Sequence, residues 1–282
     1  LSEKESINQE IIIMNETPII QVGILGFGTV GQGTWKHLEE NADFWEKILG
    51  VRLVPSRASV RTLDKERKVK IPTDALTTDS QSIVDDPKID LLCELIGGIE
   101  EAKKLTLRAF SLGKSVVTAN KALIAHHGQA LAEAAENAGV ALTFEAAVAG
   151  GIPILKGLRE GLAANAIGRV YGILNGTCNY ILSEMRDTGR EFDNILADAQ
   201  AEGYAEADPS FDVDGIEAAH KLAILASLAF GTQIDFSSVH VEGIRHVSPA
   251  DQDFARELGY GIKLLGIATE TEGGIEQRVH PC

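Results

Sequence analysis

Residues 19–40, IIQVGILGFGTVGQGTWKHLEE, contain the pattern that decides the fold of the first half of the chain. The apolar run Ile19–Leu25 predicts a buried strand, and the amphipathic residues after the glycines predict a helix. Between the two stands a turn with glycines at Gly26, Gly28 and Gly31. Such glycines allow a tight turn and a close approach of the backbone to a pyrophosphate at the helix N-terminus. The order predicts a dinucleotide-binding site, and a plain strand-turn-helix is the alternative.

Short apolar runs alternate with amphipathic helical patterns from residue 51 to residue 151. This alternation predicts a Rossmann-type α/β domain, a doubly wound parallel sheet with helices on its faces. Ligands of such sheets lie beyond the carboxyl ends of the strands, so the residues that follow each apolar run are of interest. The strand candidates are residues 51–60, 89–98 and 140–151, and residues 114–125 are predicted to form a strand and a turn. The helix candidates are residues 79–86, 100–113 and 127–139. The strand ends of interest are Gly97-Gly98, Asn120-Lys121 and Glu145–Gly151.

The end of the second predicted strand bears on the choice between NAD and NADP. An NAD site usually presents an acidic residue there, whereas an NADP site places an arginine near the 2′-phosphate. This chain has Arg57 and Arg61 at that place, and Lys65 and Arg67 lie just beyond. Asp64 falls in the following loop. The balance favours NADP or dual use, with ordinary solvated arginines at a strand end as the alternative.

The pattern changes after Gly151, where strands and helices are mixed in a different order. We expect a second, α+β domain there that binds the substrate. Its predicted elements are a helix at residues 153–166, a strand in residues 168–177, a helix in residues 178–187, a helical stretch from residue 193 to residue 229 interrupted by an acidic loop, a strand at residues 239–244, a helix at residues 249–259, and a closing hairpin of residues 260–270 and 274–281. The predicted domains are residues 18–150 and 151–282, preceded by a disordered leader at residues 1–17.

Composition narrows the class of protein. A chain of 282 residues suits two domains that each bury a core. With 41 acidic and 26 basic residues, the net charge of -15 argues against nucleic acid and membrane surfaces as partners. No apolar run approaches the roughly 20 residues that span a bilayer. The three cysteines are widely spaced and odd in number, so we expect no disulfide framework, no zinc site and a cytoplasmic location.

An acidic segment stands out in the second half, GYAEADPSFDVDGIEAAHKL at residues 203–222. It can be a solvated loop, a metal site or the floor of an active site. The run Asp212-x-Asp214-Gly215 is similar to part of a calcium loop but lacks the glycine spacing and terminal glutamate of an EF-hand. Its carboxylates, Glu206, Asp208, Asp212, Asp214 and Glu217, precede the single lysine Lys221.

Six motifs in this order resemble those of homoserine dehydrogenase: GFGTVG, ELIGG, TANKALIA, FEAAVAGGIPI, NGTCNYIL and GYAEADPSFDVDGIEAAHKLAILA. The resemblance runs from about Ile19 to His280, and the last two motifs are far more specific than the glycine-rich turn. It implies the NAD(P)-dependent interconversion of L-homoserine and L-aspartate 4-semialdehyde, within the biosynthesis of threonine, isoleucine and methionine.

The resemblance implies catalytic roles for three residues. A lysine suits proton transfer in both directions of an alcohol oxidation. Lys221 matches the proton donor of the family, and Lys121 matches a lysine near the nicotinamide and the substrate. Glu217 stands where the family usually has aspartate, so its carboxylate is displaced by roughly one methylene, which catalytic geometry tolerates poorly. The alternative is a surface lysine at 221 that pairs with Glu217 one helical turn earlier.

The resemblance also implies how the substrate and the cofactor bind. The carboxylate of Glu206 is expected to hold the α-ammonium of homoserine. The turn Asn175-Gly176-Thr177 can offer backbone N–H groups to the substrate carboxylate, although simple capping of a helix explains the same residues. The implied substrate-binding residues are Glu206, Tyr204, Asp212, Gly176 and Thr177. The implied cofactor-binding residues are Gly26, Phe27, Gly28, Thr29, Val30, Gly31, Arg61, Gly97 and Lys121.

Three further expectations follow from the family. A structural sodium ion would take oxygen ligands from Glu145 and from the backbone of Val148, Gly150 and Ile152. A homodimer would form through the sheet of the second domain. Family members continue beyond the point that matches Cys282, often into a regulatory ACT domain, so the second domain is expected to be C-terminally incomplete here.

Two other functions stay open at this point. One is a different NAD(P)-dependent small-carbonyl or semialdehyde dehydrogenase; an acylating enzyme would need a nucleophilic cysteine, and Cys178 is the only cysteine near the expected site. The other is a nucleotide-sensing module without catalysis.

Overall fold

The computed structural model describes residues 17–282, so the predicted leader lies outside the described residues except for Thr17. The described chain forms two compact units, each treated below by itself. The first unit comprises the residues up to Thr118 together with Ala132–Thr143, and the second comprises Ala119–Leu131 and Phe144–Cys282. By this grouping, residues 119–131 and 144–150 belong with the second unit.

The first unit is built on a six-stranded sheet in the order β3-β2-β1-β4-β5-β6. Every neighbouring pair is parallel, which confirms the predicted doubly wound Rossmann-type sheet. Val22 and Ile24 of the central strand β1 are buried, as expected for a strand covered on both faces. The strands are β1 Ile19–Leu25, β2 Arg52–Ser59, β3 Leu76–Thr77, β4 Leu91–Glu94, β5 Ser115–Thr118 and β6 Leu142–Thr143.

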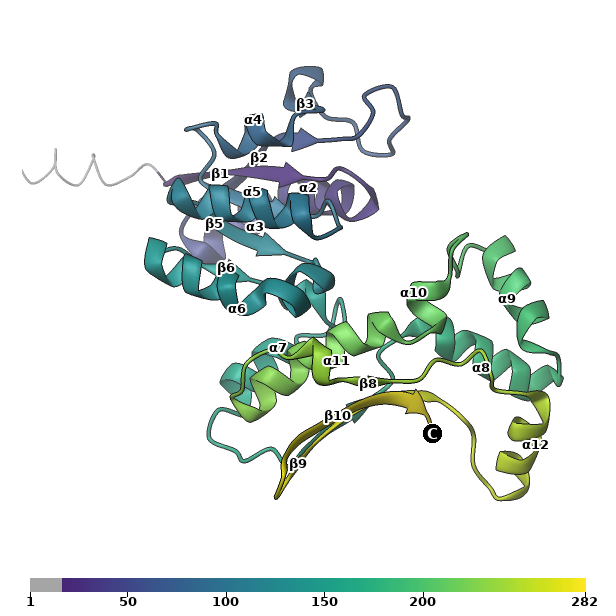
Figure 1. Ribbon diagram of the computed structural model, residues 1–282. Coiled ribbons are helices and arrows are strands. Elements are labelled where there is room, and N and C mark those ends of the chain that lie inside the picture. The colour runs from purple at the N-terminus through teal and green to yellow at the C-terminus, as the bar shows by residue number, and fades with distance from the viewer. Residues whose placement is uncertain (1–16) are drawn as a thin grey trace, which may run out of the picture. The chain divides into compact units, whose positions relative to one another are not determined.

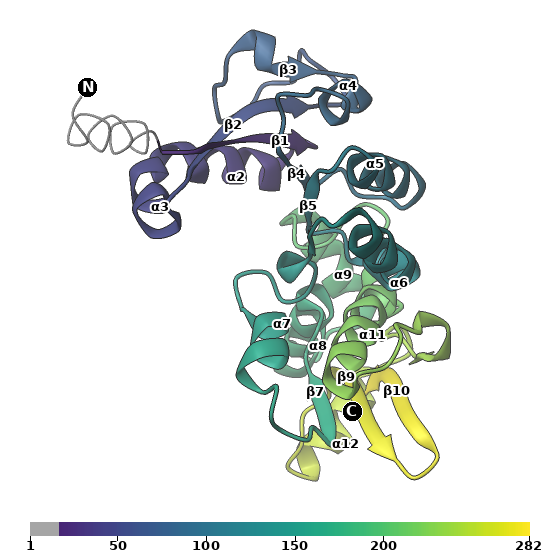
Figure 2. The same cartoon turned by 90° about the vertical axis from the view of Figure 1, so that its left-hand side faces the viewer.

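Helices cover both faces of this sheet (Figures 1 and 2). Helices α2 and α3 pack on one face, and α4 and α5 pack on the other (Figure 2). Helix α3 was not predicted. The helices are α2 Thr29–Glu40, α3 Ala42–Leu49, α4 Ser80–Val84 and α5 Glu100–Ser111; α6 Lys121–Ala138 runs through residues assigned to both units.

Two predicted boundaries near the strand ends were wrong. Residues 122–125 were predicted to belong to a strand and turn before a helix at residue 127, but they are helical because the Asn120 side chain accepts the N–H of Leu123 and starts α6. The strand predicted at residues 140–151 is reduced to Leu142–Thr143. After it the chain forms the short 3₁₀ turn η2 (Glu145–Ala147), and the left-handed φ of 50° at Ala149 is incompatible with a strand.

Gly31 lies where α2 packs against the glycine-rich turn. A Cβ at this position would lie 2.1 Å from the carbonyl oxygen of Gly26, whereas a Cβ at Gly33, in the same helix, would meet nothing within 4 Å. We therefore expect Gly31→Ala to lower the free energy of unfolding by about 2–3 kcal/mol, because the helix must move. Gly33→Ala is the control and should raise it by up to about 1 kcal/mol, since alanine favours a helix. Urea unfolding of both variants checks this, and equal stabilities would contradict the packing argument.

The second unit is built on a four-stranded mixed sheet in the order β7-β9-β10-β8. Its strands are β7 Arg169–Gly172, β8 His240–Val241, β9 Leu264–Thr271 and β10 Gly274–Pro281. The hairpin of β9 and β10 confirms the predicted closing pair of strands. Helix α11 (Ile216–Phe230) lies along one face of the sheet, and α8 (Gly176–Thr188) and α10 (Ser210–Val213) lie on the same side (Figure 1). The predicted α+β class of this half is confirmed.

The helices of this unit start and stop at recognisable residues. Helix α8 (Gly176–Thr188) is capped by Asn175 and ends at Gly189, and α11 follows Gly215, whose φ is 82°. The helix predicted from Pro153 ends at Gly161, earlier than expected. The remaining helices are α7 Ile154–Lys156, continued by the π-helical η3 Gly157–Gly161, then α9 Phe192–Ala201, α10 Ser210–Val213, the 3₁₀ turn η4 Phe236–Ser238 and α12 Pro249–Glu257. Within residues 17–282, every helix is too short or too polar to cross a bilayer.

Candidate functional site

The glycine-rich turn of the first unit has the geometry of a phosphate-binding loop. Gly26 has a φ of 97°, and a Cβ there would lie 2.5 Å from the carbonyl oxygen of Leu95, so only glycine fits. A Cβ at Gly28 would meet no described atom within 4 Å, which leaves the backbone open to a ligand. Gly28 is also the N-cap of α2 and supplies no side-chain cap, so the first N–H groups of that helix face this opening. These features fit the pyrophosphate of a dinucleotide.

Ser59, at the end of β2, holds this turn in place. Its side chain accepts the N–H of Gly26 at 3.1 Å, and its carbonyl accepts the N–H of Phe27 at 2.8 Å. Ser80 donates its hydroxyl to Ser59 at 2.9 Å. The predicted cofactor residue Phe27 therefore lies in a turn that is fixed from the neighbouring strand, and Thr29 and Val30 are the first two residues of α2.

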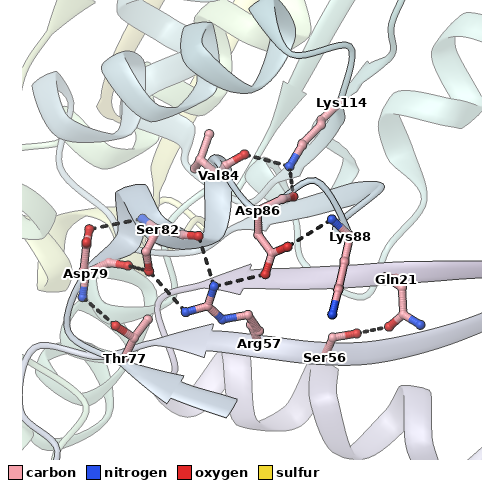
Figure 3. A network of polar contacts seen from close by, with 10 residues as sticks. All are labelled: Gln21, Ser56, Arg57, Thr77, Asp79, Ser82, Val84, Asp86, Lys88 and Lys114. Atoms are coloured by element: carbon pink, nitrogen blue, oxygen red, sulfur yellow. Dashed lines mark hydrogen bonds and ion pairs between the residues drawn. The ribbon is translucent and has the colours of Figure 1, made fainter. Parts of the chain in front are cut away.

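The two arginines near the end of β2 have different surroundings. Arg57 donates to the carboxylate of Asp86 at 3.1 Å and to both the carbonyl and the hydroxyl of Ser82 (Figure 3). The same network includes the buried Lys114, which donates to the carbonyl of Val84 at 2.7 Å (Figure 3). Arg57 thus ties β2 to α4. Arg61 lies beyond the strand and is exposed, which leaves it as the candidate for a 2′-phosphate.

In the second unit, one carboxylate joins two lysines from different helices. Oxygen Oε1 of Glu217, on α11, lies 2.7 Å from Nζ of Lys221 and 3.3 Å from Nζ of Lys121, the first residue of α6. Lys221 also donates to the carbonyl of Leu174 at 2.8 Å. The side chains of Glu217 and Lys221 are only 18% and 17% exposed, so solvent screens the pair less than at an open surface. All three predicted catalytic residues therefore meet in one cluster.

Asn175 connects this cluster to the acidic segment. Its Nδ2 donates to Oδ1 of Asp212 at 2.8 Å and to Oε2 of Glu217 at 3.2 Å, while its Oδ1 accepts the N–H of Cys178 and caps α8. Thr177 donates its hydroxyl to the carbonyl of Tyr204 at 3.1 Å. One buried amide thus fixes two carboxylates and a helix N-terminus together. Capping and a role in the site are compatible here.

The two carboxylates of the cluster are expected to ionise differently. Burial and the hydrogen bond shared with Glu217 raise the pKa of Asp212 to about 6. Burial also opposes the ionisation of Glu217, but the hydrogen bond from Asp212 and the charges of Lys221 and Lys121 outweigh it and lower the pKa of Glu217 to about 2. Near neutral pH both carboxylates are therefore mostly ionised, and as the pH falls through about 6 the pair takes up its first proton mainly on Asp212.

A carboxyl titration followed by 13C NMR tests this division. We expect one midpoint of the pair near pH 6 and the other below pH 3. In Glu217→Gln the upper midpoint should fall, because the neighbouring negative charge that raises the pKa of Asp212 is gone. An unchanged midpoint in that variant would show that burial alone sets it. The assignment follows from Asp212→Asn, which should abolish the upper step.

Not every predicted substrate residue joins the cluster through a direct bond. Tyr204 is 59% exposed, and its ring lies 4.9 Å from that of Tyr180. Glu206 is exposed, and its backbone carbonyl is held by Gln200 of α9 at 3.0 Å. Gly176 begins α8 and is exposed. These residues border the same segment, and their contact with a substrate stays a prediction.

In the turn predicted to bind sodium, at residues 145–152, the carboxylate of Glu145 also has a structural role. Glu145 accepts the N–H groups of Leu155 and Lys156, each at 2.9 Å, and so caps α7. The left-handed Ala149 turns the backbone between Val148 and Gly150. Among residues 17–282, no group of three or more His, Cys, Asp and Glu side chains could hold a metal. A sodium ion at this turn stays a prediction, with Glu145 and the backbone carbonyls of Val148, Gly150 and Ile152 as its expected oxygen ligands.

Sequence reasoning placed Asn175 beside the site but did not assign it. The available signal was its position directly before a helix, which is typical of an N-cap. That pattern does not predict the hydrogen bonds that Nδ2 of Asn175 donates to Asp212 and Glu217, which are distant in the sequence.

Comparisons with known proteins identify the family of the chain. Residues 26–145 match the family described as homoserine dehydrogenase, NAD binding domain, and residues 153–282 match the family described as homoserine dehydrogenase. The homoserine dehydrogenase of Pseudomonas aeruginosa is 51% identical over 262 residues, which cover 93% of this chain and 60% of that protein. The chain thus spans about three fifths of the length of the curated relatives it matches.

Solved structures show the same relationship. The crystal structure of a homoserine dehydrogenase from Thiobacillus denitrificans superposes with a TM-score of 0.89 at 52% identity, over 94% of this chain and 62% of that one. A hyperthermophilic archaeal homoserine dehydrogenase in complex with NADPH gives a TM-score of 0.76 at 25% identity, over 94% of this chain and 82% of that one. The two family models together cover almost the whole described chain, and this chain belongs to the homoserine dehydrogenase family.

Proposed function

We propose that the protein catalyses the NAD(P)-dependent interconversion of L-homoserine and L-aspartate 4-semialdehyde. The observation that carries this proposal is the cluster in which Glu217 bridges Lys121 and Lys221. Family membership supports the same reaction, and the relatives of this chain are themselves homoserine dehydrogenases. Through this reaction the protein would serve the biosynthesis of threonine, isoleucine and methionine.

Lys221 is the group that holds and moves the proton in this proposal. In the oxidative direction its neutral amine accepts the hydroxyl proton of homoserine as the C–O bond gains double-bond character. In the reductive direction its ammonium returns that proton to the alkoxide oxygen. A nicotinamide cofactor held through the glycine-rich turn Gly26–Gly31 would supply the hydride acceptor of the oxidation and the hydride donor of the reduction. Glu217 orients Nζ of Lys221 through their 2.7 Å contact, and the carbonyl of Leu174 fixes the same nitrogen from a second direction.

The acidic segment supplies the complement to the substrate ammonium. Asp212 is held by Asn175 at 2.8 Å, and Glu206 extends from the exposed loop that precedes α10. At the opposite end, the N-terminus of α8 at Gly176 and Thr177 suits the substrate carboxylate, because the first N–H groups of a helix favour anions. The substrate would therefore bind between a positive helix end and a set of carboxylates.

The cofactor is proposed to be NADP, with NAD as the second choice. The turn Gly26–Gly31 would hold the pyrophosphate, and Gly97, with its positive φ of 72°, follows β4 at the carboxyl edge of the same sheet. Arg61 is exposed just beyond β2, where a 2′-phosphate is recognised in such folds. A related archaeal enzyme was solved with NADPH, which supports the same choice.

A sodium ion is proposed at the turn that contains Val148, Gly150 and Ile152. The support is the carboxylate of Glu145 beside a backbone that changes direction at Ala149, whose φ is 50°. The ion would neutralise clustered carbonyl dipoles and keep the turn in shape. Its role would be structural.

A homodimer and a cytoplasmic location complete the proposal. The helices α8, α10 and α11 gather on one side of the second unit's sheet, while Tyr171 of β7 remains 68% exposed and can meet a second copy. The cysteines Cys93, Cys178 and Cys282 are all free thiols, which suits a reducing compartment.

The test is the NADP-dependent oxidation of L-homoserine by the purified chain, followed as NADPH absorbance. Turnover of homoserine with no phosphate-dependent acylation would support the proposal. Nucleotide binding without turnover would instead support a sensing module. An acylating dehydrogenase is disfavoured because burial raises the pKa of the fully buried Cys178 thiol to about 12, so no thiolate is available there.

A further inference from the structure

A pair of histidines joins two helices beside the lysine cluster. His126 lies in the second turn of α6, which begins at Lys121, and His220 lies on α11 directly before Lys221. The two Nε2 atoms are 3.2 Å apart, and the rings meet edge to face with centroids 5.1 Å apart. Both histidines belong to the second unit. Neither residue has a role in the proton chemistry above.

The surroundings of His220 are apolar and aromatic. The ring is 2% exposed, and the rings of Phe236 and Phe211 lie 4.3 and 5.3 Å away. Burial, together with the nearby positive charges of His126 and Lys121, lowers the pKa of His220 to about 4, against an opposing effect of Glu217. His220 is therefore neutral near pH 7 and acts as a hydrogen-bonding group.

The hydrogen bonding of the two ring nitrogens indicates which of them carries the proton of His220. Nδ1 of His220 is buried and has no hydrogen-bond partner within the described chain. A neutral imidazole carries one N–H, and leaving a buried N–H unpaired costs more than leaving a lone pair unpaired. The proton is therefore on Nε2, which donates to the Nε2 lone pair of His126. The bond has a defined direction, from α11 to α6.

We propose that the His126–His220 hydrogen bond is a positioning contact that sets the spacing of Lys121 from Glu217 and Lys221. It rests on the proposed function, because it acts through those lysines. The 3.3 Å ion pair of Lys121 with Glu217 is a second polar contact between the helices, and Lys121 is 32% exposed, so that pair by itself defines the spacing weakly. The histidine bond lies one helical turn from Glu217 and is shielded by Phe236. Both histidines are positioning residues.

Three variants of the full chain test the proposal. His126→Phe keeps an aromatic ring against Phe236 but removes the accepting nitrogen. His126→Gln places an amide near the position of Nε2 and can restore the bond. His246→Phe, in an exposed turn after β8, makes the same change away from the pair. We expect kcat for L-homoserine oxidation to fall about 10-fold in His126→Phe with KM within about 2-fold, since a misplaced lysine slows the chemical step.

The pattern across the variants separates positioning from packing. His126→Gln should recover most of the lost kcat, and His246→Phe should match the wild type. A normal kcat in His126→Phe would overturn the proposal. A folded His126→Gln that is as slow as His126→Phe would also overturn it, because the loss would then come from the ring and not from the bond.

A spectroscopic measurement keeps the proposal testable without turnover. Long-range 1H–15N spectra of the histidine rings should show His220 as the Nε2–H form in the wild type and a loss of that single form in His126→Phe. The 13C-dimethylated lysine signals of Lys121 and Lys221 should shift in the same variant and stay unchanged in His246→Phe. If homoserine is not turned over but these signals respond, the proposed function fails and the positioning contact stands. If they do not respond, the positioning contact fails.

Discussion

Replacing Lys221 by alanine is expected to lower kcat/KM for L-homoserine about 1,000-fold, within the range found when a general acid–base group is removed. Nζ of Lys221 lies 2.7 Å from Glu217 and donates to the carbonyl of Leu174, so it is held in place as well as charged. Its loss should leave NADP affinity within about 2-fold, because the glycine-rich turn belongs to the other unit. Steady-state kinetics and a fluorescence titration with NADPH measure both quantities.

Two controls separate proton transfer from charge and from packing. Lys221→Arg keeps the charge but cannot release a proton near neutral pH, so it should remain at least about 100-fold impaired. Lys263→Ala removes another partly buried lysine, which donates to Asn179 and Ser183, and should retain kcat/KM within about 3-fold. Added methylamine should restore part of the activity of Lys221→Ala alone. Wild-type rates in Lys221→Arg would contradict the assigned role.

Replacing Glu217 by glutamine is expected to lower kcat/KM about 100-fold at neutral pH. The neutral amide removes the negative charge that lies between Nζ of Lys121 and Nζ of Lys221, at 3.3 and 2.7 Å. The two ammonium groups would then repel each other, and one of them would turn away or lose its proton. The effect should appear mainly in kcat, because Lys221 would no longer be oriented for the transferred proton.

Glu217→Asp tests the departure from the usual family residue. It keeps the charge and shortens the side chain by one methylene, so we expect kcat/KM to stay within about 10-fold of the wild type. Unfolding in urea should show both variants to be folded, which excludes a general loss of structure. An unchanged kcat/KM in Glu217→Asp would show that the length of this side chain does not matter, and an unchanged value in Glu217→Gln would rule out the bridging role.

The first unit was predictable to a large extent because its signals are local. Gly26 needs a positive φ and Gly31 has no room for a Cβ, and both requirements arise within a few residues of one turn. The alternation of strands and helices gave the parallel sheet for the same reason. The errors lie at the boundaries of elements. One example is the strand predicted at residues 140–151, which ends at Thr143; the left-handed conformation of Ala149 further along this segment could not be predicted from its composition.

The site was only partly predictable. The sequence marked Lys121, Glu217 and Lys221 through resemblance to a family, and the spacing of Glu217 and Lys221 predicted their pairing across one helical turn. It did not indicate that Lys121 shares the same carboxylate oxygen. It singled out Arg61 as a cofactor residue but did not indicate that Arg57 ties β2 to α4.

The amino-acid sequence by itself determined the Rossmann-type sheet, the glycine-rich turn and the acidic segment that ends at Lys221. Only the tertiary structure decided that Asn175 bonds to Glu217, 42 positions away, and that His220 meets His126, 94 positions away. The physical reason is the range of the interactions involved. Backbone dihedrals and helix caps depend on neighbouring residues, whereas contacts between charged or polar side chains exist only after the helices that carry them have packed on a common core.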